Sequence, residues 1–233
     1  NPSASDSGAC TRTRTGGAQN FAQWAGQRAV RGPRSAKFFA CLMGVVFHQG
    51  GTVSTILTGT TVRPVTDRQR VSHEELSYVV DSTASPAATV LPFNAWPLYI
   101  GGLIVGTIPL FATTADAISF FFSSLRYNIY GFFAVSMTLL FALGWLPWVG
   151  GKMKRAIERA RTTAQLNGPG AKPLAADELT VVRVPHGYRS GKISFLLPMG
   201  VLLGVAIVPY VIAQLRGQQG TVYIAEAFGL AVL

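Results

Sequence analysis

Apolar residues in this chain gather into long runs that are separated by short polar segments. Three of these runs hold about 20 residues, which is the length that crosses the hydrocarbon core of a bilayer. They are residues 93–113, 127–149 and 193–215, and a shorter fourth run covers 222–233. The pattern predicts an all-α integral membrane protein with several transmembrane helices.

Two earlier segments also have helical character. Residues 16–34 place aromatic side chains at helical spacing and then turn basic, which predicts a helix that ends at a cytoplasmic surface. Residues 37–63 are mostly apolar, are interrupted by Gln49-Gly50-Gly51 and have a basic residue at each end. A re-entrant hairpin would keep both basic ends on one side of the membrane, so we expect a helical hairpin here.

A polar segment then leads into the helix that carries the strongest candidate for chemistry. Ser72 precedes Glu75 by three positions, which is the spacing of a capping box and predicts a helix start at Ser72. Asp81 follows two turns later, and the residues after it, Ser82-Thr-Ala-Ser-Pro86, combine hydroxyl groups with a proline. This composition predicts a helix that is interrupted within the membrane.

Asp81 is the residue that most clearly indicates a function. An ionisable side chain inside an apolar segment is costly, and such residues commonly belong to ion or substrate pathways. Sodium prefers oxygen ligands, and Asp81 has hydroxyl neighbours at Ser82, Thr83 and Ser85. One carboxylate can hold either a proton or a sodium ion, so these four residues are predicted to bind the ion. The alternative is that Asp81 caps a helix at a cytoplasmic surface.

Four other residues are candidates for the transport pathway or for substrate binding. His48 and Gln49 lie at the expected tip of the hairpin, and Asn94 follows the proline-rich interruption. Arg63 could face a negatively charged substrate. It also stands four residues before Asp67, which we expect to form an ion pair that fixes the loop rather than to bind an ion.

The composition supports the membrane interpretation. Hydrophobic residues make up 49% of the chain and charged residues 13%, compared with about 25% charged residues in soluble domains. The net charge is +10, but the basic residues are spread over segments that flank the apolar runs. They therefore indicate topology rather than nucleic-acid binding. We expect one transporter domain over residues 1–233, with a basic cytoplasmic loop at 150–192. His73 and His186 are expected at the surface.

Three motifs occur in an order that resembles the NhaC-type Na+/H+ antiporter family. They are Arg63-Pro-Val-Thr-Asp67, Ser72-His-Glu-Glu-Leu76 and Asp81-Ser-Thr-Ala-Ser-Pro86. The resemblance covers roughly residues 15–160. It implies a fold of inverted repeats with broken helices, of which this chain holds part of the first repeat. It also implies that Asp81, Ser82 and Thr83 belong to the ion site.

The sequence departs from the family pattern at one place. Many members have a Phe-Asp-Asp-like element where this chain has Phe47-His48-Gln49-Gly50-Gly51. If those carboxylates bind ions or protons, this chain has replaced them with a neutral or titratable pair. Family resemblance therefore assigns no role to positions 48 and 49.

Three functional readings follow. The first is a Na+/H+ antiporter in the cytoplasmic membrane, multi-pass, in which Asp81 is the shared cation and proton site. The second is a sodium- or proton-coupled transporter of a small organic anion, such as a carboxylate or amino acid. The third is a membrane scaffold whose basic 150–192 loop recruits an acidic partner or lipid.

The remaining expectations concern partners and chemistry. No nucleophile-base pair, metal cluster or phosphate loop has a recognisable spacing, so we expect no enzyme activity and no cofactor beyond the transported Na+ and H+. The expected partners are the lipid bilayer and the transported ions or solute, with homo-oligomerisation left open, and nucleic acid is not among them. The chain begins at Asn1 without a methionine and ends in an apolar run, which indicates a fragment of a longer transporter.

Overall fold

The computed structural model describes residues 17–48, 51–91, 93–107, 109–171, 191 and 193–216. All of the regular structure that these residues form is helical. The helices in chain order are α1 Gly17–Ala29, α2 Pro33–Val46, α3 Gly51–Arg68, α4 His73–Val90, α5 Trp96–Ile104, η1 Pro109–Phe111, α6 Thr114–Ser124, η2 Leu125–Tyr127, α7 Ile129–Leu143, α8 Gly151–Thr163 and α10 Ile193–Leu215.

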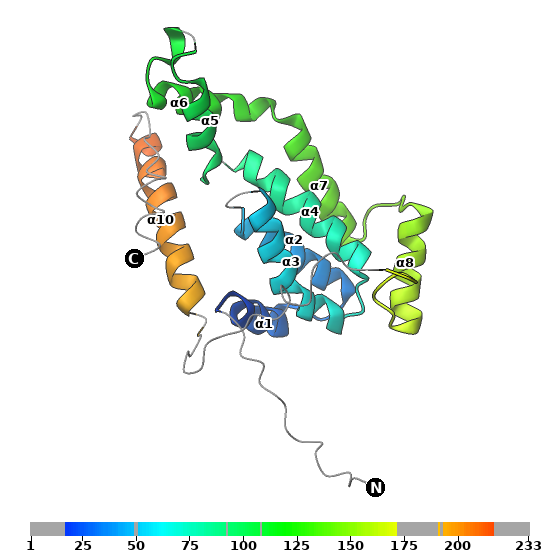
Figure 1. Cartoon of the computed structure of the whole chain (residues 1–233). Coiled ribbons are helices and arrows are strands. Elements are labelled where there is room, and N and C mark those ends of the chain that lie inside the picture. Colours follow the sequence, from blue (N-terminus) through cyan, green and yellow to red (C-terminus); the bar gives the residue numbers. More distant parts are fainter. Residues whose placement is uncertain are drawn as a thin grey trace.

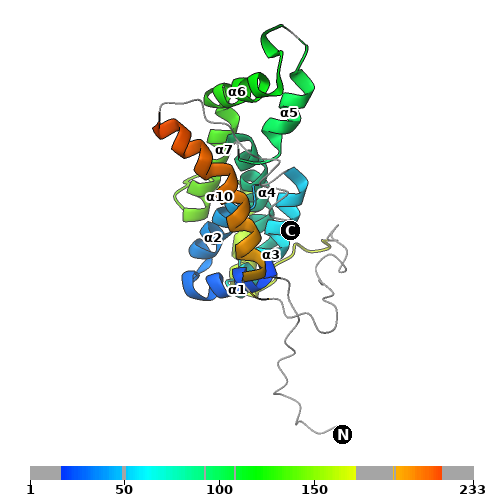
Figure 2. The same cartoon turned by 90° about the vertical axis from the view of Figure 1, so that its left-hand side faces the viewer.

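Helix α4 is the centre of the bundle, because α2, α3 and α7 all pack against it (Figures 1 and 2). The side chains between these helices form the largest buried apolar cluster, which includes Phe39, Met43, Val62, Val79 and Phe141. Burying an aliphatic or aromatic side chain of this size contributes about 1.5–3 kcal/mol. The position of α4 is therefore fixed from three sides.

The start of α4 confirms the predicted capping box. The Ser72 hydroxyl accepts a hydrogen bond from the Glu75 backbone N–H at 3.2 Å, and Glu75 Oε2 accepts one from the Ser72 N–H at 3.1 Å. Both bonds satisfy backbone donors that a helix start leaves free. Glu74 and Glu75 also place negative charge at the positive end of the helix dipole.

The predicted interruption at residues 82–86 is wrong, because α4 continues through Pro86 as far as Val90. A proline has no N–H, so the carbonyl four residues earlier, that of Ser82, loses its partner within the helix. The hydroxyl of Thr138 on α7 donates to this carbonyl at 3.2 Å instead. The helix tolerates Pro86 because α7 supplies the missing donor. Helix α4 ends at Val90, and the next helix, α5, begins at Trp96.

No helix formed by the described residues is both long and apolar enough to cross a membrane. Run 93–113 is divided among α5, which has nine residues, η1 and the residues before α6. Run 127–149 holds α7, whose 15 residues span about 22 Å, against the roughly 30 Å of a hydrocarbon core. Helix α10 has 23 residues, with Pro198 and Pro209 inside it.

This finding contradicts the predicted fold of a polytopic transmembrane transporter with a re-entrant hairpin and a partial inverted repeat. The helical part of the prediction is correct, and α2 and α3 do pack against each other as the two arms of a helical hairpin. In run 93–113 the reason for the error is local. Gly106 adopts a left-handed conformation with φ 76°, and Pro109 follows closely, so the apolar run cannot continue as one helix.

The basic segment that begins at residue 150 was expected to be a loop, but it starts with a helix. Helix α8 presents Ala156 and Ala160, four residues apart, as its buried side, and it packs against α4. It ends at Ala164, which has a left-handed φ of 58°. Residues 172–190 and 192 lie outside the described part of the chain.

Candidate functional site

Asp81 lies in the middle of α4 on a side of the helix that is exposed to solvent. Ser77 and Ser85, one turn before and one turn after it, are also exposed. Residues four apart on a helix lie on the same side, so these three form one polar stripe, here called the Asp81 stripe. Within the part of the chain described, the Asp81 carboxylate makes no hydrogen bond and no ion pair.

The two residues after Asp81 take other roles. Thr83 is fully buried and its hydroxyl donates to the sulfur of Cys41 at 3.6 Å, which joins α4 to α2. Ser82 is turned by about 100° around the helix from Asp81. The structure thus brings Ser85 to the side of Asp81 but not Ser82 or Thr83. Ser77 was missed by sequence reasoning, although its place four residues before Asp81 could have identified it.

The buried charge in this helix belongs to Glu75 rather than to Asp81. Glu75 Oε1 accepts a hydrogen bond from Lys37 Nζ of α2 at 2.9 Å, with 5% of the lysine side chain and 2% of the glutamate side chain exposed. The same ammonium group lies 4.4 Å from the centre of the Phe141 ring of α7. A buried ion pair persists only when both partners are well satisfied. Here one charge pair links α2, α4 and α7.

His48 follows α2 and is buried. Its Nδ1 lies 2.7 Å from the carbonyl oxygen of Val45, which makes Nδ1–H the donor in a neutral ring. Burial lowers the pKa of His48, although hydrogen bonds to backbone groups oppose this shift. Its Nε2 is buried without a partner among the described residues. Gln49, the other residue of the expected hairpin tip, lies outside the described residues.

Asn94 holds the turn between α4 and α5. Its amide donates to the carbonyl oxygens of Ala88 and Leu91, each at 2.7 Å, and its Oδ1 accepts from the Trp96 N–H at 2.8 Å. These three bonds satisfy a fully buried side chain. Asn94 is therefore engaged in fixing the backbone where the helical path is interrupted.

Arg63 lies on α3 and pairs with Asp67 one turn later, at 3.7 Å. The expected ion pair of Asp67 is thus confirmed. Asp67 also lies 3.0 Å from Nε2 of His73, whose Nδ1 lies 2.6 Å from Oδ1 of Asn167. Both ring nitrogens of His73 face oxygen atoms, so the protonated ring can donate twice. His73, which was expected at the surface, keeps 19% of its side chain exposed and is held by these two contacts.

The segment after α8 is attached to the start of α4 by this histidine and by an ion pair, and we call these contacts the α8 latch. Arg159 on α8 contacts both carboxylate oxygens of Glu74, at 2.7 and 2.8 Å, and also donates to the carbonyl of Gln165 at 3.1 Å. The hydrogen bond to Asp67, together with the one to Asn167, raises the pKa of His73, while burial opposes the shift.

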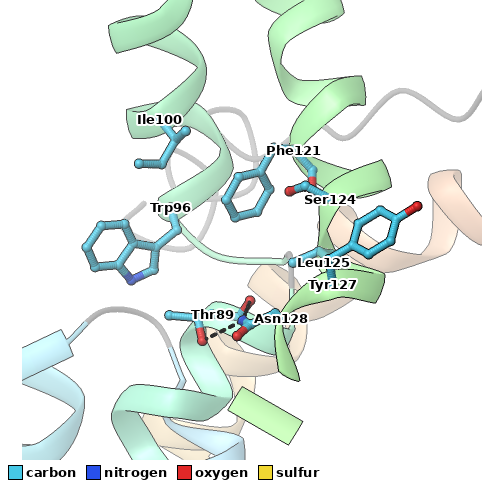
Figure 3. Close-up of a pocket in the computed structure, with 8 residues that line it drawn as sticks. All are labelled: Thr89, Trp96, Ile100, Phe121, Ser124, Leu125, Tyr127 and Asn128. Carbon is cyan, nitrogen blue, oxygen red and sulfur yellow. Dashed lines mark hydrogen bonds between the residues drawn. The ribbon is translucent and has the colours of Figure 1, made fainter. Parts of the chain in front are cut away.

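A cavity of about 360 Å³ lies at the opposite end of the molecule, between the end of α4, α5 and η2 (Figure 3). It is lined by Thr89, Trp96, Ile100, Phe121, Ser124, Leu125, Tyr127 and Asn128. The Asn128 amide donates to the Thr89 hydroxyl at 3.0 Å, as drawn in Figure 3. The lining has no charged group, so this cavity offers no site for a bare cation. Among the described residues, no cluster of three or more His, Cys, Asp or Glu could hold a metal ion.

Comparison with known proteins adds one relative. No protein-family model matches the chain, and no solved structure matches it. A protein of Haemophilus influenzae, described as uncharacterized, is 34% identical over 131 residues, which are 56% of this chain and 25% of that protein. The matched part of the chain thus spans about a quarter of the length of this relative. The resemblance to NhaC-type antiporters stays a prediction.

Proposed function

We propose that this chain belongs to a Na+/H+ exchanger acting at the cytoplasmic membrane, and that Asp81 is the carboxylate that binds Na+ and H+ in turn. The observation that carries the proposal is the Asp81 stripe. It places an exposed carboxylate between two exposed hydroxyl groups, and none of the described residues neutralises its charge.

The chemistry follows from competition for one group. A hard cation takes several oxygen ligands, of which the Asp81 stripe offers a carboxylate and the hydroxyls of Ser77 and Ser85. Water or other parts of the protein would supply the rest. A proton on the carboxylate removes the negative charge that holds the cation, so binding of either ion displaces the other. Mutual exclusion at one site is sufficient for exchange.

The alternative of an organic-anion transporter gains no support from Arg63. Its guanidinium pairs with Asp67, so it lacks the free positive charge that a substrate carboxylate would need. The Asp81 stripe carries a negative charge, which favours a cation. For these reasons the exchanger is the function we put forward.

The test uses the full-length protein in proteoliposomes with a sodium gradient and a pH-sensitive dye. We expect Asp81→Asn to abolish sodium-dependent proton movement, because the amide has no charge and cannot exchange a proton. The matched control is Glu158→Gln, which removes another exposed carboxylate from the chain, on α8, and should leave exchange intact. Retained exchange in Asp81→Asn would overturn the proposal.

A second set of variants tests the geometry. Ser77→Ala and Ser85→Ala should each raise the KM for sodium severalfold, because each removes an oxygen from the same side of α4. Ser82→Ala is the control, since Ser82 points elsewhere on the helix. An equal rise in KM for all three serine variants would contradict the role of the Asp81 stripe.

A further inference from the structure

The charged residues in the described part of the chain are concentrated at one end of the bundle, where α1, α3 and α8 end and where α2 and α4 begin (Figure 1). The opposite end, built from α5, α6, η2 and the end of α10, has Asp116, Arg126 and Arg216 as charged side chains among its described residues (Figures 1 and 2). We call the first the basic end. A separation this sharp gives the molecule a strongly positive field at one end.

The acidic residues at the basic end are almost all used in ion pairs. Glu75 pairs with Lys37, Glu74 with Arg159, and Asp67 with Arg63 and His73. Among the described residues, only Glu158 adds a further negative charge there. Among the described residues, the exposed cations of this end outnumber the one unpaired carboxylate, that of Glu158.

One group of these cations lies where α1, α2 and α3 meet. Arg28, Arg31 and Arg34 are exposed at the junction of α1 and α2, and Arg68 and Arg70 are exposed at the end of α3. None of the five forms an ion pair with a described residue. Arg68 lines a hollow between the last turn of α1 and the last turn of α3, together with Gln27 and Gln69.

A second group lies on α8. Lys152, Lys154, Arg155 and Arg161 are all exposed, and Lys154, Arg155 and Arg161 lie away from the side of the helix that Ala156 and Ala160 bury. The two groups adjoin each other, since Arg70 Nη1 donates to the Arg161 carbonyl oxygen at 3.4 Å. Together they form one continuous positive surface.

Two exposed tryptophans lie beside these cations, and their position is informative about the binding partner. Trp145 and Trp148, between α7 and α8, are 71% and 84% exposed. Arg34 lies against the preceding Gly144, where an added Cβ would be 3.0 Å from its Nε. Exposed tryptophans next to cations are typical of membrane–water interfaces, where the ring enters the headgroup layer and the cations meet phosphate.

We propose that the basic end binds the surface of an anionic lipid bilayer, with Trp145 and Trp148 entering the headgroup layer and the cations of α8 and of the α1–α3 junction contacting lipid phosphates. Near this edge α7 also exposes Leu140. A nucleic acid would also attract the cations, but it would leave these apolar side chains in water. The proposal does not depend on ion exchange at Asp81.

The test measures binding of the 233-residue chain to phosphatidylcholine vesicles with and without phosphatidylglycerol, by flotation and by tryptophan fluorescence. We expect at least about tenfold tighter binding to the anionic vesicles, because each basic residue near an anionic surface adds attraction. High salt should remove most of this preference. Equal binding to neutral and anionic vesicles would overturn the proposal.

Variants locate the surface. The triple variant K152Q/K154Q/R155Q should lose most of the preference for anionic vesicles, whereas R126Q, which removes an exposed cation at the opposite end, should keep it. A second triple variant, R28Q/R31Q/R68Q, tests the same end without altering α8, and circular dichroism checks that each variant keeps its helical content. Preference retained in both triple variants would contradict the proposal, as would displacement of the vesicles by a short DNA duplex.

Discussion

Glu75 and Asp81 stand six residues apart on the same helix, but their environments are opposite. Glu75 is buried and has a partner for each carboxylate oxygen, with Lys37 on one and the Ser72 N–H on the other. Asp81 is exposed and has no partner among the described residues. The buried carboxylate stabilises the fold, whereas the exposed one is available for the ion exchange that we propose. If burial of a charged group were the only criterion, Glu75 would be taken as the functional carboxylate and Asp81 as an ordinary surface residue.

The largest expected effect comes from removing the charge of Glu75. Glu75→Gln keeps an acceptor for the Ser72 N–H but leaves the Lys37 ammonium buried without a counter-charge. We expect the free energy of unfolding to fall by about 3–5 kcal/mol, measured by chemical denaturation. The double variant Lys37→Met/Glu75→Gln should recover most of this loss, because no charge then remains buried. A double variant as unstable as the single one would contradict this account of the pair.

The ion pair of the α8 latch should contribute less, since it is partly exposed and water screens it. Arg159→Ala is expected to lower the free energy of unfolding by about 1 kcal/mol, near the upper limit for such pairs because Arg159 also binds the carbonyl of Gln165. Lys154→Ala, on the exposed side of the same helix, is the control. A double-mutant cycle with Glu74→Gln checks the contact, and strictly additive effects would show that the two side chains do not interact.

His73 should make the α8 latch sensitive to pH. Its pKa is raised in the folded protein above the ordinary value of 6.5, so its stabilising effect is complete below about pH 6.5 and is lost as the pH rises through the folded pKa. The charged groups around it are Asp67, Arg63 and, through the adjoining ion pair, Glu74 with Arg159. The expected difference in stability between wild type and His73→Gln is on the order of 0.5 kcal/mol at low pH and vanishes at high pH. A difference that does not change with pH would rule this out.

The smallest effect on stability is expected at Asp81. Asp81→Asn should change the free energy of unfolding by less than about 0.5 kcal/mol, as is usual for an exposed side chain without a partner. The same denaturation experiment measures it beside Glu75→Gln. A loss of stability comparable to that of Glu75→Gln would mean that Asp81 has a structural partner, and the contrast between the two carboxylates would then fail.

The contrast also shows which features the sequence could predict. The capping box of Ser72 and Glu75 was predictable because its two residues lie within one turn. The ion pair of Glu75 with Lys37 was not, because 38 residues separate the partners and no local pattern joins them. Asp81 was expected to be buried because its neighbours in sequence are apolar, but the composition of a segment does not determine which side of a helix a residue occupies.

The long apolar runs correctly predicted helices, but they did not predict where those helices are interrupted. The three runs that fall on described residues do form helices, whereas run 222–233 lies outside the described residues. The run beginning at residue 93 is divided where Gly106 turns the backbone, and the helix α4 before it ends where Asn94 binds three backbone groups. Helix α8 was missed because its charged residues and the nearby glycine and proline residues resemble a loop. Its buried side consists of two alanines, which give a weak hydrophobic signal.

The double role of Glu75 limits how this position can change during evolution. Aspartate keeps the charge but is shorter by one methylene, so it cannot reach Lys37 while also binding the Ser72 N–H. Glutamine keeps the length but cannot neutralise the lysine. An acceptable replacement would have to come together with a second change at position 37, so we expect the two positions to vary jointly among relatives.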